Sequence, residues 1–285
     1  MKRRRLVRVP ASSANLGPGY DVLAAALSLE LELEVEETGE FFVHSDNPGL
    51  PTDRSNLCVR AFERLHSADG VTFQIHSQIP TSAGLGSSAA AIVAGLAAAD
   101  HMFELDAPLF DLAVELEGHP DNVAAAIHGG FVICPAPGEE PVRFDPPPGL
   151  EGVLAIPGYE VPTAEARAAM PAEVPVAEAM HNVGHAALLV LGLAKDDFSL
   201  IGRGLHDLVH QPRRRSLYPR AMEFVERAEE LGAVGATISG AGPTVLFWCH
   251  WQQTGGLVER LKAEAPDCEI RRVAFAPGGA DVREL

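Results

Sequence analysis

Strict alternation of apolar and polar residues over positions 27–36 (LSLELELEVE) predicts a half-buried β-strand, with leucines on one face and glutamates on the other. We expect residues 41–44 to form its hairpin partner. Shorter apolar stretches indicate further strands at 6–9, 71–79 and 130–134. The first half of the chain therefore predicts a sheet with one face buried and the other in water.

Helical spacing of apolar residues dominates the second half of the chain. In the first half, an alanine-rich segment at 87–102 predicts a buried helix. Further helices are expected at 56–66, 109–117, 163–170, 176–193, 198–209, 219–231 and 257–265, and another begins at the HPDN sequence of 119–122. Strands are expected at 153–156, at 235–239 and 244–249 as a hairpin, and at 270–276.

The order of these elements is mixed rather than a regular alternation of strand and helix. A doubly wound parallel sheet requires that alternation, so we predict the α+β class in two halves. We place the division between an N-terminal domain of residues 1–155 and a C-terminal domain of residues 156–285. The proline-rich stretch at 135–148 is interpreted as a surface loop.

Composition narrows the class of protein. Of the 285 residues, 47% are hydrophobic and 21% charged, which is usual for a globular protein. The net charge of −17 argues against binding to nucleic acid or to an anionic membrane. Four scattered cysteines suit buried thiols in a reducing cytosol. The start MKRRR lacks a signal-peptide core and the apolar helix from Ser87 is too short to span a membrane, so we expect a cytoplasmic protein.

Three glycine-rich turns, LGPGYD at 16–21, AGLGSS at 83–88 and SGAGP at 239–243, each follow an expected strand. The central turn opens the alanine-rich helix, so free backbone N–H groups and the positive end of a helix dipole meet there. Gly84 and Gly86 remove the side chains that would keep an anion from the backbone. We interpret this turn as a phosphate-binding loop; an ordinary capped helix after a turn is the alternative.

The loop differs from the Walker type because no lysine follows its second glycine. The lysines are Lys2, Lys195 and Lys262, and none lies in a glycine turn. Glu117, at the end of the following helix, could hold a magnesium ion together with the hydroxyl of Ser88, since both supply hard oxygen ligands.

Polar side chains cluster after Glu117, where His119, Asp121 and Asn122 stand at a helix junction. This cluster has a structural alternative as a helix cap and a buried imidazole. Basic residues gather at Arg213, Arg214 and Arg215, with Arg167 on an earlier helix. Arginines grip a carboxylate or phosphate bidentately, and the alternative is a solvated turn.

Together these motifs resemble the GHMP small-molecule kinases, and within them the homoserine kinase family. PASSANLGPGYD, IPTSAGLGSSAAA, ELEGHPDNVAAAIHGGF and GATISGAGPTV stand in the family's order, and the similarity continues through PTAEARAAMP, HNVGHAALLVLGLA and LHDLVHQPRRRSLYP. The resemblance implies ATP-dependent phosphorylation of the L-homoserine hydroxyl to O-phosphohomoserine, on the route to threonine. It implies an N-terminal half like a ribosomal-protein domain, a ferredoxin-like α/β-plait C-terminal half, and a site between them.

The resemblance also implies roles for single residues. Mg²⁺ would be held by Ser88 and Glu117, which with Asn122 form the catalytic set. The amino-acid substrate would lie against Asn15, Asp21, His119, Asn122, Arg167, Gly240 and either Arg213 or Arg214. ATP would be bound by Asn56, Pro80, Thr81, Ser82, Ala83, Gly84, Leu85, Gly86, Ser87, Ser88 and Ala89. A homodimer is common in the family.

Two assignments stay open within this resemblance. Homoserine kinases lack the lysine–aspartate pair of the mevalonate branch, and Ser12 and Ser13 stand where that branch has a basic residue. We therefore hypothesise that Asn122 orients the substrate hydroxyl, with Asp121 as a base being the competing idea. The family commonly has Pro-Tyr-Arg where this chain has Pro-Arg-Arg at 212–214, so either arginine could grip the carboxylate.

Two other functions compete with this one. A different kinase of the superfamily is disfavoured by Asp21 and the arginines, because a sugar needs neither and mevalonate has no ammonium group. A silent relative that binds nucleotide or amino acid as a regulator is disfavoured by the presence of Ser88, Glu117 and Asn122.

Overall fold

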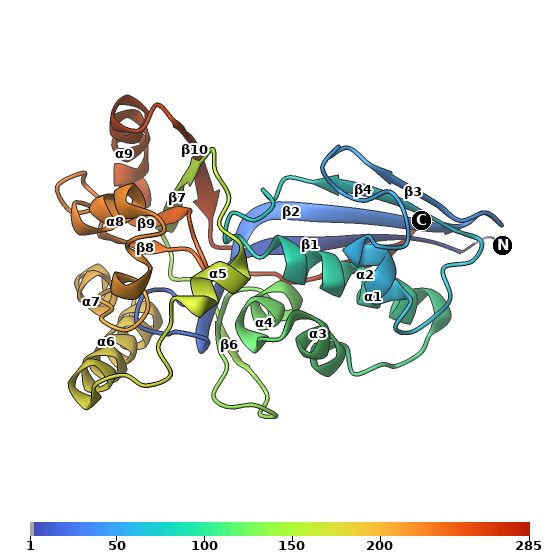
Figure 1. The fold of residues 1–285 in the computed structure, drawn as a ribbon, viewed down its shortest axis with the longest axis horizontal. Helices are drawn as coiled ribbons and strands as arrows, with labels where there is room; N and C mark the ends of the chain where they lie inside the picture. Colours follow the sequence, from blue (N-terminus) through green and yellow to red (C-terminus); the bar gives the residue numbers. More distant parts are fainter. Residues whose placement is uncertain (1–2) are drawn as a thin grey trace.

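The fold contains two β-sheets that lie side by side (Figure 1). The computed structural model describes residues 3–285, so Lys2 lies outside it. The first sheet has seven strands: β1 (Arg4–Ala14), β2 (Leu23–Glu37), β3 (Phe42–Ser45), β4 (Val71–Ser77), β5 (Phe131–Ile133), β6 (Val142–Phe144) and β11 (Asp281–Glu284). The second has four, in the order β10 (Cys268–Ala274), β7 (Leu150–Pro157), β9 (Val245–His250) and β8 (Gly235–Ile238). This mixed architecture confirms the predicted α+β class.

Helices cover each sheet (Figure 1). The first sheet carries α1 (Leu57–Phe62), α2 (Ser87–Phe103), α3 (Leu109–Glu117) and α4 (Pro120–His128), with α2 and α4 packed on β1 and β2. The second half contains α5 (Thr163–Ala168), α6 (Val176–Ala194), α7 (Phe198–Gly204), a 3₁₀ turn at Pro212–Arg214, α8 (Pro219–Glu226) and α9 (Trp251–Glu264). In this half α8 and α9 pack on the second sheet, and α6 packs on α7.

The central strand β2 follows its sequence pattern. Leu27, Leu31 and Leu33 are buried, while the glutamates between them are at least partly exposed. β2 pairs antiparallel with β1 and β4, with Leu33 opposite Val7 on one side and Ile75 on the other. The apolar face of the strand therefore contributes to the core from its centre.

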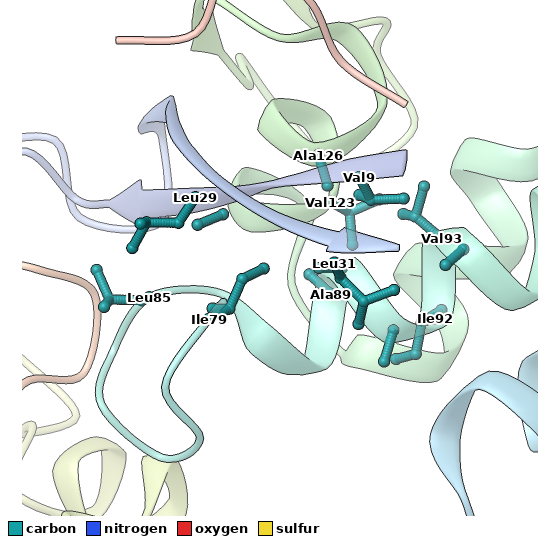
Figure 2. Close-up of a cluster of buried hydrophobic side chains, with 14 of the residues drawn as sticks. Val9, Leu29, Leu31, Ile79, Leu85, Ala89, Ile92, Val93, Val123 and Ala126 are labelled. Atoms are coloured by element: carbon teal, nitrogen blue, oxygen red, sulfur yellow. The ribbon is translucent and has the colours of Figure 1, made fainter. Parts of the chain in front are cut away.

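Alanine allows α2 to lie close against this sheet. Figure 2 shows Ala89 and Ile92 of α2 next to Leu31 of β2 in the main core, with Leu29 nearer to Ile79 and Leu85. Gly95 brings α2 next to α1, because a Cβ atom there would lie 2.1 Å from the backbone oxygen of Cys58. Burying each large aliphatic side chain contributes about 1.5–3 kcal/mol to stability, so this layer fixes the start of α2 firmly.

Several predicted elements need correction. β3 pairs in parallel with β4 rather than as a hairpin partner of β2. The stretch expected to be a loop at 135–148 contains β6, which pairs with β5. The helix expected at 198–209 ends at Gly204, because Leu205 starts a loop that runs to the 3₁₀ turn.

The chain crosses between the sheets twice. The predicted division between residues 155 and 156 falls inside β7, a strand of the second sheet that starts at Leu150. After β10 the chain returns to the first sheet as β11, which pairs with β1 and was not predicted. The two connecting segments lie next to each other, since Glu151 pairs with Ala274 and Arg143 donates to the Pro277 carbonyl.

Among residues 3–285, one helix, α6, is long and apolar enough to cross a membrane by length and composition. Only 22% of its apolar window is buried. Its buried face carries Asn182, whereas Val176, Met180 and Val183 on the opposite face are 70–75% exposed. The helix therefore has a polar contact inside the fold and an apolar surface outside it.

Candidate active site

The three glycine turns meet at the junction of the sheets. Ser239 of the third turn donates a hydrogen bond to the backbone oxygen of Gly84 (2.7 Å). A Cβ atom on Gly84 would lie 2.2 Å from the Ser239 backbone oxygen, and one on Gly86 would lie 2.1 Å from Oγ of Ser12. Both glycines have positive φ angles, +76° and +68°. Glycine is therefore required at both positions by backbone conformation and by close packing.

The loop ends at the start of α2 without a side-chain cap among the described residues, because Gly86 occupies the N-cap position in the left-handed conformation. The first N–H groups of a helix have no partner within the helix. Together with the helix dipole they favour an anion at this point.

Two cavities open on this loop. One, of about 80 Å³, is lined by side chains from both halves, including Asn15, Asp21, Ser88, Glu117, His119, Asp121, Asn122, Arg167, Arg214 and Gly240. The other, of about 280 Å³, is lined by Asn56, Thr81 and mostly apolar side chains. Ser82, Ser87 and Ser88 line both. A ligand with an apolar group and a charged group could therefore occupy both cavities across the loop.

Ser88 and Glu117 contact each other at the boundary of these cavities. The Ser88 hydroxyl donates a 2.6 Å hydrogen bond to Oε2 of Glu117, whose side chain is 10% exposed. No group of three or more His, Cys, Asp or Glu side chains within residues 3–285 is arranged to hold a metal ion. The hydroxyl and carboxylate oxygens nevertheless suit Mg²⁺, which usually takes few protein ligands and completes its shell with water and phosphate oxygens.

His119, Asp121 and Asn122 form a hydrogen-bonded chain at the start of α4. Nδ1 of His119 lies 3.1 Å from Oδ1 of Asp121, which also accepts the Asn122 backbone N–H at 2.8 Å. Burial lowers the pKa of His119, but the hydrogen bond and charge of Asp121 and the charge of Glu117 outweigh it, so the net shift is upward. Asp121 therefore favours a protonated imidazole.

The orientation of the Asn122 side chain is fixed by Ser12. The buried Ser12 hydroxyl donates a 2.8 Å hydrogen bond to Oδ1 of Asn122. Because the amide oxygen is bound by Ser12, the amide nitrogen is the group that Asn122 presents to the cavity.

Oppositely charged side chains face each other on the other side of this cavity. Arg167 of α5 makes two hydrogen bonds to Asp21, of 2.8 and 3.1 Å. Asn15 accepts the backbone N–H of Asp21 (3.0 Å) and donates to the Gly240 carbonyl (2.9 Å). Asn15 thereby connects the first and third glycine turns and fixes the position of Asp21.

The two candidate arginines of the 212–214 sequence lie in different places. Arg214 is 2% exposed, lines the smaller cavity, and donates from Nε to the Ala166 carbonyl at 3.0 Å. Arg213 lies outside both cavities, where its guanidinium pairs with Glu178 of α6 and donates to the Leu208 carbonyl. The structure therefore brings Arg214, and not Arg213, to the other site residues.

Some of the residues predicted to bind ATP do not line either cavity. Leu85 lines the smaller cavity, whereas Pro80, Ala83 and Ala89 line neither. The smaller cavity is also lined by Ala14, Tyr20 and Thr163, which the sequence did not single out as site residues. Of these, Tyr20 packs its ring against both guanidinium groups of the site. The position of Tyr20 next to Asp21 in the first glycine turn could have identified it as a site residue.

Comparisons with known proteins identify the family of the chain. The family model for the GHMP kinases N terminal domain matches residues 56–130, and that for GHMP kinases C terminal matches residues 189–267. The homoserine kinase of Moorella thermoacetica is 40% identical over 97% of this chain and 99% of its own. The homoserine kinase of Thermus thermophilus is 39% identical over 90% of both chains.

Solved structures give the same result. The crystal structure of homoserine kinase from Cytophaga hutchinsonii superposes with a TM-score of 0.87, at 28% identity, over 99% of this chain and 98% of the other. Mevalonate diphosphate decarboxylase from Staphylococcus aureus shares the fold at 15% identity with a TM-score of 0.74. The fold and the glycine turns thus define a GHMP kinase. Within that class, the chain belongs to the homoserine kinase family.

Proposed function

We propose that this protein transfers the γ-phosphoryl group of ATP to the side-chain hydroxyl of L-homoserine, giving O-phospho-L-homoserine for threonine biosynthesis. The observation that carries the proposal is one cavity that joins an anion-binding helix start to an oppositely charged pair, Asp21 and Arg167. The first feature suits a phosphate, and the second suits a molecule with both an ammonium and a carboxylate group.

ATP would span the two cavities. Its base would occupy the larger, mostly apolar one beside Asn56, and its phosphates would follow the loop of residues 80–91 to the start of α2. Mg²⁺ would be held by Ser88 and Glu117, where it would neutralise charge on the phosphates during transfer.

The amino acid would replace the Asp21–Arg167 pair with two new ones. Its ammonium group would bind Asp21, and its carboxylate would bind Arg167 and Arg214, whose guanidinium groups both lie near the ring of Tyr20. A neutral alcohol makes neither new pair, and an acid without an ammonium group leaves Asp21 without a partner once Arg167 turns to its carboxylate. The cavity therefore selects a zwitterion.

Catalysis would depend on alignment more than on a strong base, as is usual for phosphoryl transfer. The Asn122 amide nitrogen would donate a hydrogen bond to the substrate hydroxyl and orient it, and the proton would leave to phosphate or water. Asp121 is the competing base, but its carboxylate already accepts from His119 and from a backbone N–H.

The test is ADP release with Mg·ATP and a panel of L-homoserine, D-homoserine, L-serine, mevalonate and galactose. We expect turnover with L-homoserine far above the others. Turnover with a non-amino-acid alcohol would exclude the ammonium and carboxylate assignments while keeping a kinase. ATP binding without turnover of any alcohol would favour a regulatory relative.

We further propose that the protein is cytoplasmic and forms a homodimer. The outer face of α6 is the observation that supports the dimer. Val176, Met180, Val183 and Leu191 are 43–75% exposed, and the other residues of that face are alanine and glycine. An apolar strip of this kind is typical of an interface. Glu173 and Lys195, beyond its two ends, make no ion pair within residues 3–285, and an antiparallel second copy would bring each near the other.

A further inference from the structure

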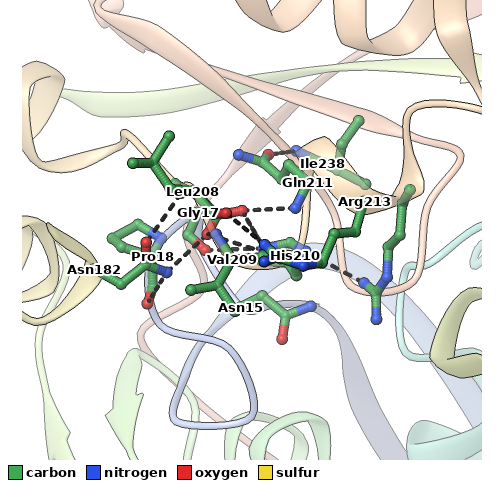
Figure 3. A network of polar contacts seen from close by, with 12 residues as sticks. Asn15, Gly17, Pro18, Asn182, Leu208, Val209, His210, Gln211, Arg213 and Ile238 are labelled. Carbon is green, nitrogen blue, oxygen red and sulfur yellow. Dashed lines mark hydrogen bonds and ion pairs between the residues drawn. The ribbon is translucent and has the colours of Figure 1, made fainter. Parts of the chain in front are cut away.

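His210 lies buried behind Arg214, in the loop between α7 and the 3₁₀ turn. It is 0% exposed and does not line the smaller cavity. Figure 3 shows it at the centre of a polar network with Gly17 and Asn182. Its Nε2 lies 2.9 Å from the Gly17 carbonyl oxygen, and its Nδ1 lies 3.3 Å from Nη1 of Arg214.

The partners of the ring determine its tautomer. A guanidinium has donors and no acceptor, so Nδ1 must accept from Arg214. A carbonyl oxygen only accepts, so Nε2 must carry the proton that Gly17 receives. His210 is therefore neutral and protonated on Nε2. Burial lowers its pKa to about 4 against the opposing charge of Asp207, which agrees with a neutral ring.

The loop that carries His210 is held by Asp207. This buried carboxylate accepts the backbone N–H groups of Val209, His210 and Gln211. Asn182 of α6 donates to Asp207 at 2.7 Å and to the Pro18 carbonyl at 3.1 Å. The imidazole is therefore fixed relative to both the first glycine turn and α6.

The hydrogen bonds of Arg214 leave only one of its nitrogens free to bind a ligand. Nε donates to Ala166, and Nη1 donates to His210 and to the Gly240 carbonyl (3.2 Å). Nη2 makes no hydrogen bond of ordinary geometry to the described residues, the nearby hydroxyl of buried Tyr218 included, and the side chain lines the cavity. Three donors are thus occupied at the back of the guanidinium, and two remain.

We propose that His210 is a positioning residue that directs the two Nη2 donors of Arg214 toward the carboxylate of the amino-acid substrate. The inference rests on the proposed function. His210 does not touch the substrate, so its removal should weaken homoserine binding and leave nucleotide binding unchanged.

Two substitutions of His210 distinguish a positioning role from a role in packing alone. In His210→Asn, Oδ1 takes the place of Nδ1 and can accept from Arg214, while the donor to Gly17 is lost. In His210→Gln, Nε2 takes the place of the ring Nε2 and can donate to Gly17, while the acceptor for Arg214 is lost. The two variants therefore each keep one of the two contacts.

We expect His210→Gln to raise KM for L-homoserine about 10- to 100-fold, the effect of losing one hydrogen bond to a charged group, with KM for ATP unchanged. His210→Asn should stay within a few-fold of the parent. L-Homoserinol, which lacks the carboxylate, should be used by His210→Gln about as well as by the parent. A lower homoserine KM for Gln than for Asn, or parallel losses for ATP and homoserine, would overturn the proposal.

A second measurement does not depend on the variants folding. Nitrogen chemical shifts of ¹⁵N-histidine in the parent protein should show a neutral, Nε2-protonated ring for His210 at pH 7. An Nδ1-protonated or doubly protonated ring would overturn the proposal. If the parent protein turns over no homoserine, the proposed function fails; if it does and the variants behave alike, only this inference fails.

Discussion

At the scale of single residues, the two adjacent arginines test the site most directly. We predict that Arg214→Ala raises KM for L-homoserine about 10- to 100-fold, because a bound carboxylate loses a charge-assisted hydrogen-bonding partner. Arg213→Ala is the matched control, since its guanidinium pairs with Glu178 outside the cavities. Steady-state kinetics with saturating ATP measure both. The reverse result would move the carboxylate contact to Arg213.

Single residues also show how far the sequence could lead. Asp21, Arg167 and Arg214 were identified through the resemblance to the homoserine kinase family, which their charges fit, and the structure brings them together. The sequence could not show which of Arg213 and Arg214 binds the carboxylate. The two side chains point in different directions because they lie in a 3₁₀ turn, and the sequence did not predict that turn. His210 was missed because we expected a continuous helix almost to that position.

At the scale of elements, the phosphate loop depends on close contact between two turns. We predict that Gly84→Ala lowers the free energy of unfolding by about 1–3 kcal/mol, because φ is +76° and the added Cβ would meet the Ser239 carbonyl. Gly158→Ala is the control, since a Cβ atom there would have no other atom within 4 Å and its φ is unexceptional. Thermal unfolding and KM for ATP measure the effect; an unchanged Tm for Gly84→Ala would contradict it.

Elements with local signals were predicted well, and elements defined by distant partners were not. β2 was recognised by its alternation and α2 by its alanine-rich run. β3 was paired wrongly because nearness in sequence favours a hairpin, whereas the chain passes through α1 before β4 and pairs in parallel. β11 is short and polar, and only its pairing with β1 makes it a strand.

At the scale of the whole molecule, the outer face of α6 makes the oligomeric state testable. We predict that the protein is a dimer in solution and that Val183→Glu makes it monomeric. In an antiparallel pairing of two α6 helices, the symmetric interface would bury two unpaired carboxylates, each costing several kcal/mol. Light scattering coupled to size-exclusion chromatography measures the mass directly.

The matched control for this experiment is Val142→Glu, on β6, where the valine is 55% exposed against 71% for Val183. A general effect of added charge would change both proteins, whereas an interface on α6 predicts dissociation of the Val183 variant alone. A monomeric parent protein, or a dimer that survives Val183→Glu, would contradict the pairing. Recovery of the parent protein with membranes, abolished by Val183→Glu, would instead assign the apolar face of α6 to a lipid surface, because that face would then bind acyl chains rather than a second helix.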